Sequence, residues 1–600
     1  MGAPAPCRSA CSPMAWMLAH GMCSDGGAMA LRPEDLQATY CATLVDEWAR
    51  CGVEHAVVCP GSLSTPLALA LASDDRLTVH VHHDERSAGF LALGLGAASG
   101  EPAVVLTTSG TAAVELHAAV VEADLAGVPL LVCTADRPPE LLDVGAPQAI
   151  DQARLYGRSV RWFHAPGVAE AAAASTWRAT AARAYAESAG ATPGPVQLNL
   201  AFREPLIGQP DDLPPPRPGG GAWAWRPEPG PPFVAPVGLA ADLAGRRGVI
   251  VAGAGSGPGD VLALVATALG WPVLASPQAE VWSEPGAPVV PAADALLRLE
   301  LEALRPEVIV RLGGSLASGV VGAWLAASGA AEIVAAGAGR WDDPRGTAAV
   351  VLSMRADDLL GAWALDVAGI EPVDDGAWAA TWQDHGRAAL AVILDALDAE
   401  TEPTEPGVAR ALVGALPAGA SLVASSSMPI RDLEWYARPS VTLEVHANRG
   451  ANGIDGVVST AVGVALADPS RPTALLIGDV AFLHDSNGLL GACDRGIDLV
   501  VVVVDNDGGG IFSFLPSATA VAPDRFERLF GTPHGLDLVA LAAAYGATAR
   551  RVTDVGLAVT NALATGGVHV LVVGTDRAAN VAVHGRLNAA AALAVARLSE

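Results

Sequence analysis

The sequence predicts an α/β protein of three domains, each a doubly wound parallel sheet with helices on both faces. Strand-like apolar runs alternate with amphipathic helical segments along nearly the whole chain, a pattern typical of βαβ units. A length of 600 residues corresponds to roughly two to four domains of ordinary size. The alternation is interrupted at residues 209–237, which are dense in proline and glycine, and at the polar residues 400–406. Two interruptions separate three folded segments, so three domains are expected.

The expected boundaries follow from these interruptions. We expect a first domain at 29–208, a linker at 209–237, a central Rossmann-like domain at 238–398 and a third domain at 399–600. In the first domain the expected helices are 36–50, 85–98 and 111–126, and the expected strands are 55–59, 103–107 and 129–134. Later apolar strands are expected at 248–252, 473–477, 499–504 and 568–573. Residues 1–28 lack a sustained period, so we expect a disordered, dispensable extension that stems from a misplaced start codon.

The charge balance limits the partners of the protein. All 36 basic residues are arginine, and 64 acidic residues give a net charge of −28. Such a charge repels nucleic acids and anionic membranes, and no run of 18 uninterrupted apolar residues predicts a membrane span. The eight cysteines form no C-x-x-C pair, which favours a reduced, cytoplasmic setting. An anionic substrate would therefore have to be held locally by a few arginines.

The clearest chemical motif follows two neighbouring apolar strands. Gly478 and Asp479 end the first strand, and Asn506 and Gly508 follow the second, with 27 positions between Asp479 and Asn506. A carboxylate, an amide oxygen and a glycine carbonyl at the carboxyl edge of a sheet suit a hard cation such as Mg²⁺ and a diphosphate. Gly-Asp alone is more often a strand-ending turn. The pairing with Asn-x-Gly between two apolar strands favours the metal site.

This motif resembles the thiamine diphosphate (ThDP) enzymes, whose hallmark is Gly-Asp followed by an asparagine after a similar interval. The resemblance implies three doubly wound parallel-sheet domains of the ThDP enzyme type, namely a pyrimidine-binding, a central and a diphosphate-binding domain. It also implies that Asp479, Asn506 and the carbonyl of Gly508 hold Mg²⁺, with Mn²⁺ as the alternative, on the cofactor diphosphate. Gly478 would contact the cofactor as well.

A second ThDP feature is a carboxylate for the aminopyrimidine ring. Glu85 opens a helix after the strand at 77–81, where in isolation it is a surface partner of the helix dipole. In ThDP enzymes a glutamate in this place shares a proton with ring N1′, which leads to the nucleophilic ylid. That glutamate and the metal site come from different subunits. The resemblance therefore implies a homodimer or a dimer of dimers with active sites at the subunit interface.

Two strings narrow the family. Residues 135–141 read A-D-R-P-P-E-L, and residues 448–456 read N-R-G-A-N-G-I-D-G. With segments 59–67 and 426–432 they resemble the 2-succinyl-5-enolpyruvyl-6-hydroxy-3-cyclohexene-1-carboxylate synthase family, the ThDP enzymes of menaquinone biosynthesis. The implied reaction decarboxylates 2-oxoglutarate and adds the resulting succinic semialdehyde carbanion equivalent to isochorismate. Both substrates are anionic, so arginine forks are the expected binding groups.

The resemblance carries over position by position. Ser427, Arg431 and Arg449 match positions that take 2-oxoglutarate carboxylates. On the isochorismate side, the matching positions are Ser62, Arg137 and Gln148. The remaining matches are to the cofactor or the apolar wall, where Ile454 would bend the cofactor into its reactive shape: Gly453, Ile454, Ile511, Phe512 and Leu515. Arg86 is a further cation near this site.

Several positions depart from the family pattern. Leu63 stands where the family has an arginine, and Gly319 and Val320 stand where it has a Lys-Arg pair. The chain has no lysine, so that lysine is absent under any alignment. Ser426 replaces an asparagine. Each lost charge-assisted contact is worth about 1.5–3 kcal/mol, so two or three losses would weaken acceptor binding by orders of magnitude.

Three functions stay open at this point. The first is the menaquinone-pathway reaction with a rearranged acceptor pocket. The second is a related ThDP carboligase or 2-oxo acid decarboxylase with a less anionic acceptor. The third is a cofactor-binding protein without turnover, which the presence of Glu85, Asp479 and Asn506 argues against.

Overall fold

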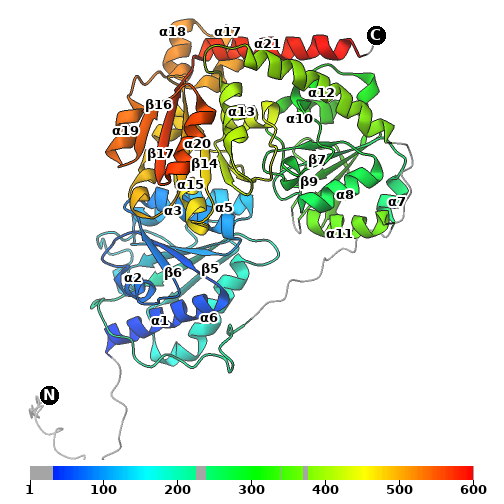
Figure 1. Cartoon of the computed structure of the whole chain (residues 1–600). Coiled ribbons are helices and arrows are strands. Elements are labelled where there is room, and N and C mark those ends of the chain that lie inside the picture. The colour runs from blue at the N-terminus through cyan, green and yellow to red at the C-terminus, as the bar shows by residue number, and fades with distance from the viewer. Residues whose placement is uncertain (1–31, 225–237, 338–339, 369–375, 599–600) are drawn as a thin grey trace, which may run out of the picture.

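The computed structural model describes residues 32–224, 238–337, 340–368 and 376–598 (Figure 1). The predicted extension at 1–28 and residues 225–237 of the predicted linker lie outside the described residues. The described residues form three parallel sheets with helices packed against them, so the predicted α/β fold class is confirmed. The exact domain boundaries stay a prediction.

The first sheet has the strand order β2-β1-β3-β4-β6-β5, and all of its pairs are parallel. Its strands are β1 (His55–Val58), β2 (Thr78–Val81), β3 (Ala103–Thr107), β4 (Leu130–Asp136), β5 (Trp162–Gly167) and β6 (Pro195–Ala201). Its helices are α1 (Pro33–Cys51), α2 (Thr65–Ala72), α3 (Glu85–Ser99), α4 (Thr111–Glu115), α5 (His117–Ala126) and α6 (Ala174–Ser188). The single helix expected at 111–126 is thus divided at Leu116 into α4 and α5.

The central sheet has the order β11-β10-β9-β7-β8. Its strands are β7 (Gly248–Ala252), β8 (Val273–Ala275), β9 (Val308–Leu312), β10 (Ala331–Ala336) and β11 (Ala348–Ser353). Its helices are α7 (Leu239–Leu243), α8 (Gly259–Leu269), α9 (Ala293–Leu297), α10 (Gly319–Ala327), α11 (Ala356–Val367) and α12 (Ala377–Asp398). Helix α12 packs along the C-terminal helix α21 (Arg577–Ala596), so the central domain also contacts the third (Figure 1).

The third sheet has the order β13-β12-β14-β15-β17-β16. Its strands are β12 (Ser421–Ala424), β13 (Glu444–His446), β14 (Thr473–Gly478), β15 (Leu499–Asp505), β16 (Thr548–Arg551) and β17 (Val568–Gly574). Besides α21, its helices are α13 (Glu405–Ala415), α14 (Met428–Tyr436), α15 (Val457–Ala467), α16 (Asp479–His484), α17 (Ser517–Ala520), α18 (Pro523–Phe526), α19 (Leu538–Ala544) and α20 (Val555–Thr565). Strand β15 is central and almost wholly apolar, as expected for a strand covered on both faces.

The first and third domains pack through equivalent helices. Helix α3 follows the second strand of its sheet, α15 follows the second strand of the other, and the two lie against each other (Figure 1). Gly94 and Gly463 lie at the crossing, where a Cβ on either would overlap the backbone of the other helix. Close packing of backbones therefore depends on glycine at both positions. None of the helices in the described ranges is both long and apolar enough to cross a bilayer.

Candidate active site

A cavity of about 520 Å³ lies at the carboxyl edge of the third sheet. Parallel strands end at the same edge, so loops far apart in sequence meet there. Ten of the residues predicted from sequence line it: Ser427, Arg431, Arg449, Ile454, Gly478, Asp479, Asn506, Gly508, Ile511 and Phe512. The central domain closes one side with residues 316–319 and Arg345.

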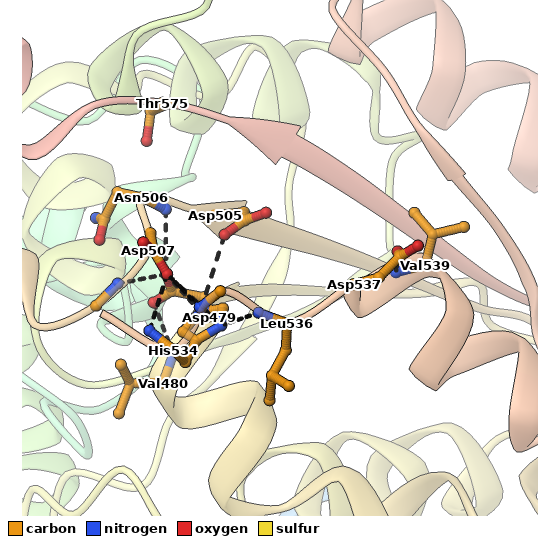
Figure 2. Close-up of polar contacts among 12 residues, drawn as sticks. Asp479, Val480, Asp505, Asn506, Asp507, His534, Leu536, Asp537, Val539 and Thr575 are labelled. Atoms are coloured by element: carbon orange, nitrogen blue, oxygen red, sulfur yellow. Dashed lines mark hydrogen bonds and ion pairs between the residues drawn. The ribbon is translucent and has the colours of Figure 1, made fainter. Parts of the chain in front are cut away.

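Asp479 is held rigidly at the edge of the cavity. Strands β14 and β15 pair so that Gly478 lies opposite Val504, which brings Asp479 next to the loop after β15. Its Oδ1 accepts a hydrogen bond from the backbone N–H of Val480 at 2.7 Å, and its Oδ2 accepts from the N–H of Asn506 at 3.1 Å and of Gly508 at 2.9 Å (Figure 2). Burial raises the pKa of the Asp479 carboxyl, while the N–H groups of Gly508 and Val480 and the His534 side chain act to lower it.

Asn506 offers an acceptor without a partner. Its Nδ2 donates to Glu405 Oε1 at 2.8 Å, whereas its Oδ1 is buried and has no hydrogen-bond partner among the described residues. A buried, unpaired oxygen costs free energy unless a ligand meets it. Gly508 has φ +141°, and a Cβ there would overlap the carbonyl of Gly531. The carboxylate, the unpaired amide oxygen and the glycine loop fit a hard cation such as Mg²⁺.

His534 joins this edge, although no motif in the sequence marks it. Its Nε2 lies 3.3 Å from Asp479 Oδ2 (Figure 2), and Asp479, Asp505 and His534 each offer a ligand atom within 4.8 Å of the others. Asp505 is partly neutralised, because its Oδ2 accepts from Arg551 Nη2 at 2.9 Å. Asp479, by contrast, forms no ion pair with an arginine among the described residues, and its ionisable neighbour is His534.

Glu405 is a second residue that sequence reasoning missed. It is the first residue of α13 and lies in the stretch predicted to separate two domains. The side chain is only 4 % exposed, and its Oε1 accepts from Asn506 Nδ2 and from Thr575 Oγ1 at 3.3 Å. Burial, and secondarily the Asp432 carboxylate, raise the pKa of Glu405. Its contact orients the Asn506 amide so that the oxygen is left for the cavity.

Three arginines line the cavity without an ion-pair partner in the described part of the chain, and two of them, Arg431 and Arg449, were predicted from sequence. Arg431 lies in α14 and donates to the carbonyl of Ser427, which has φ +76°. Arg449 follows β13, and burial lowers the pKa of both guanidiniums. Guanidinium stays protonated in proteins, so both remain cations with free donors. Glu434, also in α14, accepts the N–H groups of Ala317 and Ser318 and ties the central domain to this wall.

The remaining predicted residues lie elsewhere. Ser62, Glu85 and Gln148 line a separate cavity of about 930 Å³ at the edge of the first sheet, with Asn487 and Leu490 of the third domain. Within one chain, Glu85 and Asp479 therefore line different cavities.

Five other sequence-predicted positions fall outside both cavities. Arg137 donates from Nε to the carbonyl of Pro147 at 3.1 Å. Leu515 is 45 % exposed, and Gly453 lines a small cavity with Glu122. Val320 lies in α10 but does not line the large cavity, whereas Gly319 does. Leu63 is buried in the apolar core of the first domain.

Two contacts complete the comparison with the predicted site. Arg86 Nη2 donates to the carbonyl of His484 at 2.8 Å, which joins the start of α3 to the third domain. Ser426 is buried, and its Oγ donates to the carbonyl of Asn448 at 3.2 Å. Arg86 also lines the 930 Å³ cavity beside Glu85, and Ser426 lines the 520 Å³ cavity.

The first and third domains each match a family model of the ThDP-dependent enzymes. Residues 39–155 match the model described as thiamine pyrophosphate enzyme, N-terminal TPP binding domain, and residues 433–573 match the corresponding C-terminal TPP binding domain. A solved structure from Mycobacterium smegmatis, described as a thiamin diphosphate-dependent enzyme, shares the fold. It has a TM-score of 0.66 and 19 % sequence identity over 90 % of this chain and 99 % of that one.

Curated relatives identify the family more closely. The chain is 42 % identical to the 2-succinyl-5-enolpyruvyl-6-hydroxy-3-cyclohexene-1-carboxylate synthase of Chloroflexus aurantiacus, over 90 % of this chain and 94 % of the relative. It is 44 % identical to the synthase of the same name from Myxococcus xanthus, over 92 % and 97 %, and 43 % identical to that of Thermobifida fusca, over 92 % and 98 %. The chain belongs to this synthase family, whose members are ThDP-dependent transferases that join carbon skeletons. The predicted family is confirmed.

Proposed function

We propose that the protein catalyses the ThDP- and Mg²⁺-dependent decarboxylation of 2-oxoglutarate and the addition of the resulting four-carbon unit to isochorismate. The products are CO₂ and 2-succinyl-5-enolpyruvyl-6-hydroxy-3-cyclohexene-1-carboxylate, in the menaquinone pathway. The observation that carries the proposal is one cavity that combines an oxygen donor set for a cation with unpaired arginines for carboxylates. The names of the curated relatives support the same reaction.

The chain's own residues divide the work between binding and orientation. Asp479, Asn506 and the Gly508 carbonyl would hold Mg²⁺, or Mn²⁺, against the diphosphate, with Gly478 beside it. Arg431 and Arg449 bind the carboxylates of 2-oxoglutarate through charge-assisted hydrogen bonds. When bound, ThDP would supply a nucleophilic carbon and an electron sink for the decarboxylation.

Other residues shape the pocket and the proton path. Ile454, Ile511 and Phe512 form an apolar wall that limits water around the reacting atoms, with Gly453 and Leu515 next to it. Glu85 of a second copy would exchange a proton with the cofactor ring. Ser62, Arg137 and Gln148 of that copy are assigned to the acceptor, as the family resemblance implies.

The proposed assembly is a homodimer or a dimer of dimers in the cytoplasm. Its support is that Glu85 and the Asp479 edge line different cavities in one chain, so one chain alone does not bring the two halves together. Neither a nucleic acid nor a membrane is a proposed partner.

One assay tests the reaction. Purified protein receives ThDP, Mg²⁺ and 2-oxoglutarate, with and without isochorismate, and CO₂ release and isochorismate absorbance are followed. Stoichiometric loss of isochorismate with CO₂ release is expected. CO₂ without acceptor consumption would favour a carboligase or decarboxylase with a less anionic acceptor, and no CO₂ from any 2-oxo acid would favour a cofactor-binding protein without turnover.

A further inference from the structure

The positions where the resembled family has basic residues for the acceptor carry no cation in this chain. Gly319 lies on the cavity wall at the start of α10 and carries no side chain, while Val320 does not reach the wall. Leu63 is in the core of the first domain. These positions give an anionic acceptor no positive charge, so any cation for it has to come from another part of the chain.

Arg345 provides a cation at the same cavity as Gly319. It belongs to the connection between β10 and β11, far in sequence from the motifs of the first and third domains, and it lines the same cavity as Gly319, Arg431 and Arg449. Its guanidinium rests on α10 at Gly322, where an added Cβ would overlap Nη2 and lie close to Cζ. Glycine is unfavourable inside a helix. Here the missing side chain makes the room through which Arg345 reaches the cavity.

The charge of Arg345 is not used within the described chain. No ion pair or hydrogen bond joins its guanidinium to another described residue. The two acidic neighbours on its own loop are engaged elsewhere, since Asp342 pairs with Arg340 at 3.3 Å and Asp343 accepts the N–H of Ala348 at 3.0 Å and faces Arg311. Arg345 is also exposed, so its donors are open to a ligand.

We propose that Arg345 binds a carboxylate of the anionic acceptor and takes over the role that a basic residue at position 319 or 320 would have. The inference rests on the proposed function, because it takes an anionic molecule as the acceptor. A guanidinium is planar and suits bidentate contact with a carboxylate. Arg431 and Arg449 serve the 2-oxo acid deeper in the cavity, and Arg345 on α10 serves the second substrate.

The test separates the two substrates. Arg345→Ala is expected to raise the KM for isochorismate about 10- to 100-fold, as for loss of one charge-assisted contact. The KM for 2-oxoglutarate and the rate of acceptor-independent CO₂ release stay unchanged. Gly322→Ala keeps the charge but displaces the guanidinium, so it should raise the same KM by a smaller factor. Arg305→Ala is the matched control, an exposed arginine of the same domain that pairs with Glu302.

A restoring variant guards against a purely structural effect. In the Arg345→Ala background, Gly319→Lys returns a cation to the cavity wall and should recover part of the isochorismate KM. An unchanged isochorismate KM in Arg345→Ala overturns the inference while leaving the proposed function intact, as does an equal rise for both substrates. A wild-type enzyme that releases CO₂ but accepts only uncharged acceptors overturns both.

Discussion

The first and third sheets share one strand order but carry different chemistry at their carboxyl edges. Numbered within each domain, both run 2-1-3-4-6-5. The equivalence extends to single bonds, because the N–H of Cys59 donates to Leu106 and the N–H of Ser425 donates to Leu476, each at 2.9 Å. After the second strand, however, one domain places Glu85 and the other Arg449. The scaffold determines where functional side chains lie, and the loops determine what they do.

The two carboxyl edges also differ in the burial of their key carboxylate and in the polar contacts that it makes within the chain. Asp479 is 2 % exposed and surrounded by N–H donors of its own domain. The Glu85 side chain is only partly buried and makes no hydrogen bond or ion pair with another described residue. The third domain thus orders its carboxylate through contacts of its own, whereas the Glu85 carboxylate has no such contact in the described part of the chain.

The largest effect is expected for a substitution of Asp479, at the carboxyl edge of the third sheet. Asp479→Ala removes the buried carboxylate that accepts the N–H groups of Asn506 and Gly508, so Mg²⁺-supported ThDP affinity should fall by about 1000-fold or more, since a metal contact contributes several kcal/mol. Isothermal titration calorimetry with ThDP, with and without Mg²⁺, measures this. Asp505→Asn is the control at the same edge, because Asp505 is already paired with Arg551. Equal losses in the two variants would contradict the assignment of Asp479.

The second prediction concerns Glu85, at the carboxyl edge of the first sheet. Glu85→Gln keeps the shape of the side chain but removes its ability to exchange a proton. Turnover should fall about 100- to 1000-fold, the range for loss of a general acid–base group, while ThDP affinity changes little. Glu115→Gln is the matched control, because Glu115 lines the same cavity. A similar loss in both variants would show that the cavity's charge, and not Glu85 itself, is what matters.

The same two variants test whether Glu85 of one chain and Asp479 of a second chain form one active site. Mixed during refolding or coexpression, Glu85→Gln and Asp479→Ala chains should form heterodimers with one intact site, which restores about a quarter of wild-type activity for random pairing in a symmetric dimer. Activity of the mixture is compared with that of each variant alone. No recovery, with heterodimers detected by mass spectrometry, would place both edges of a working site in one chain.

A smaller effect is expected for loss of the hydrogen bond between Glu405 and Asn506. Glu405→Leu leaves the Asn506 amide free to rotate, and Mg²⁺ affinity should fall about 10- to 100-fold, as for loss of a residue that orients a metal ligand. Glu405→Gln keeps an acceptor and should retain most of the affinity. Thr575→Val removes the other bond to the same oxygen and is the control. If Leu and Gln behave alike, the contact does not orient Asn506.

Residues that directly follow a strand at the carboxyl edge of a sheet were easier to predict from sequence than the residues packed around them. Asp479 and Asn506 were predictable because each follows an apolar strand, and neighbouring parallel strands end together. Glu405 and His534 were not, because the start of α13 and the loop before α19 reach the same edge only through tertiary packing. Arg345 was missed for the same reason, whereas Leu63, Gly319, Val320 and the absence of lysine had suggested an acceptor pocket poor in positive charge. Local pattern predicts which strands carry chemistry, while long-range packing decides which other side chains join them.

The smallest effect concerns the helix contact that relates the two domains. Gly463→Ala places a Cβ against the backbone of Leu91 and Gly94, neither of which can rotate away, so α3 and α15 must separate. We expect a loss of about 1–3 kcal/mol in the free energy of unfolding, the usual cost of overpacking, measured by urea denaturation without cofactor. Gly361→Ala is the control, because Gly361 lies in α11 with open space around it and should gain about 0.5–1 kcal/mol. If Gly463→Ala is neutral, the close approach of the equivalent helices does not hold the two edges in their relative positions.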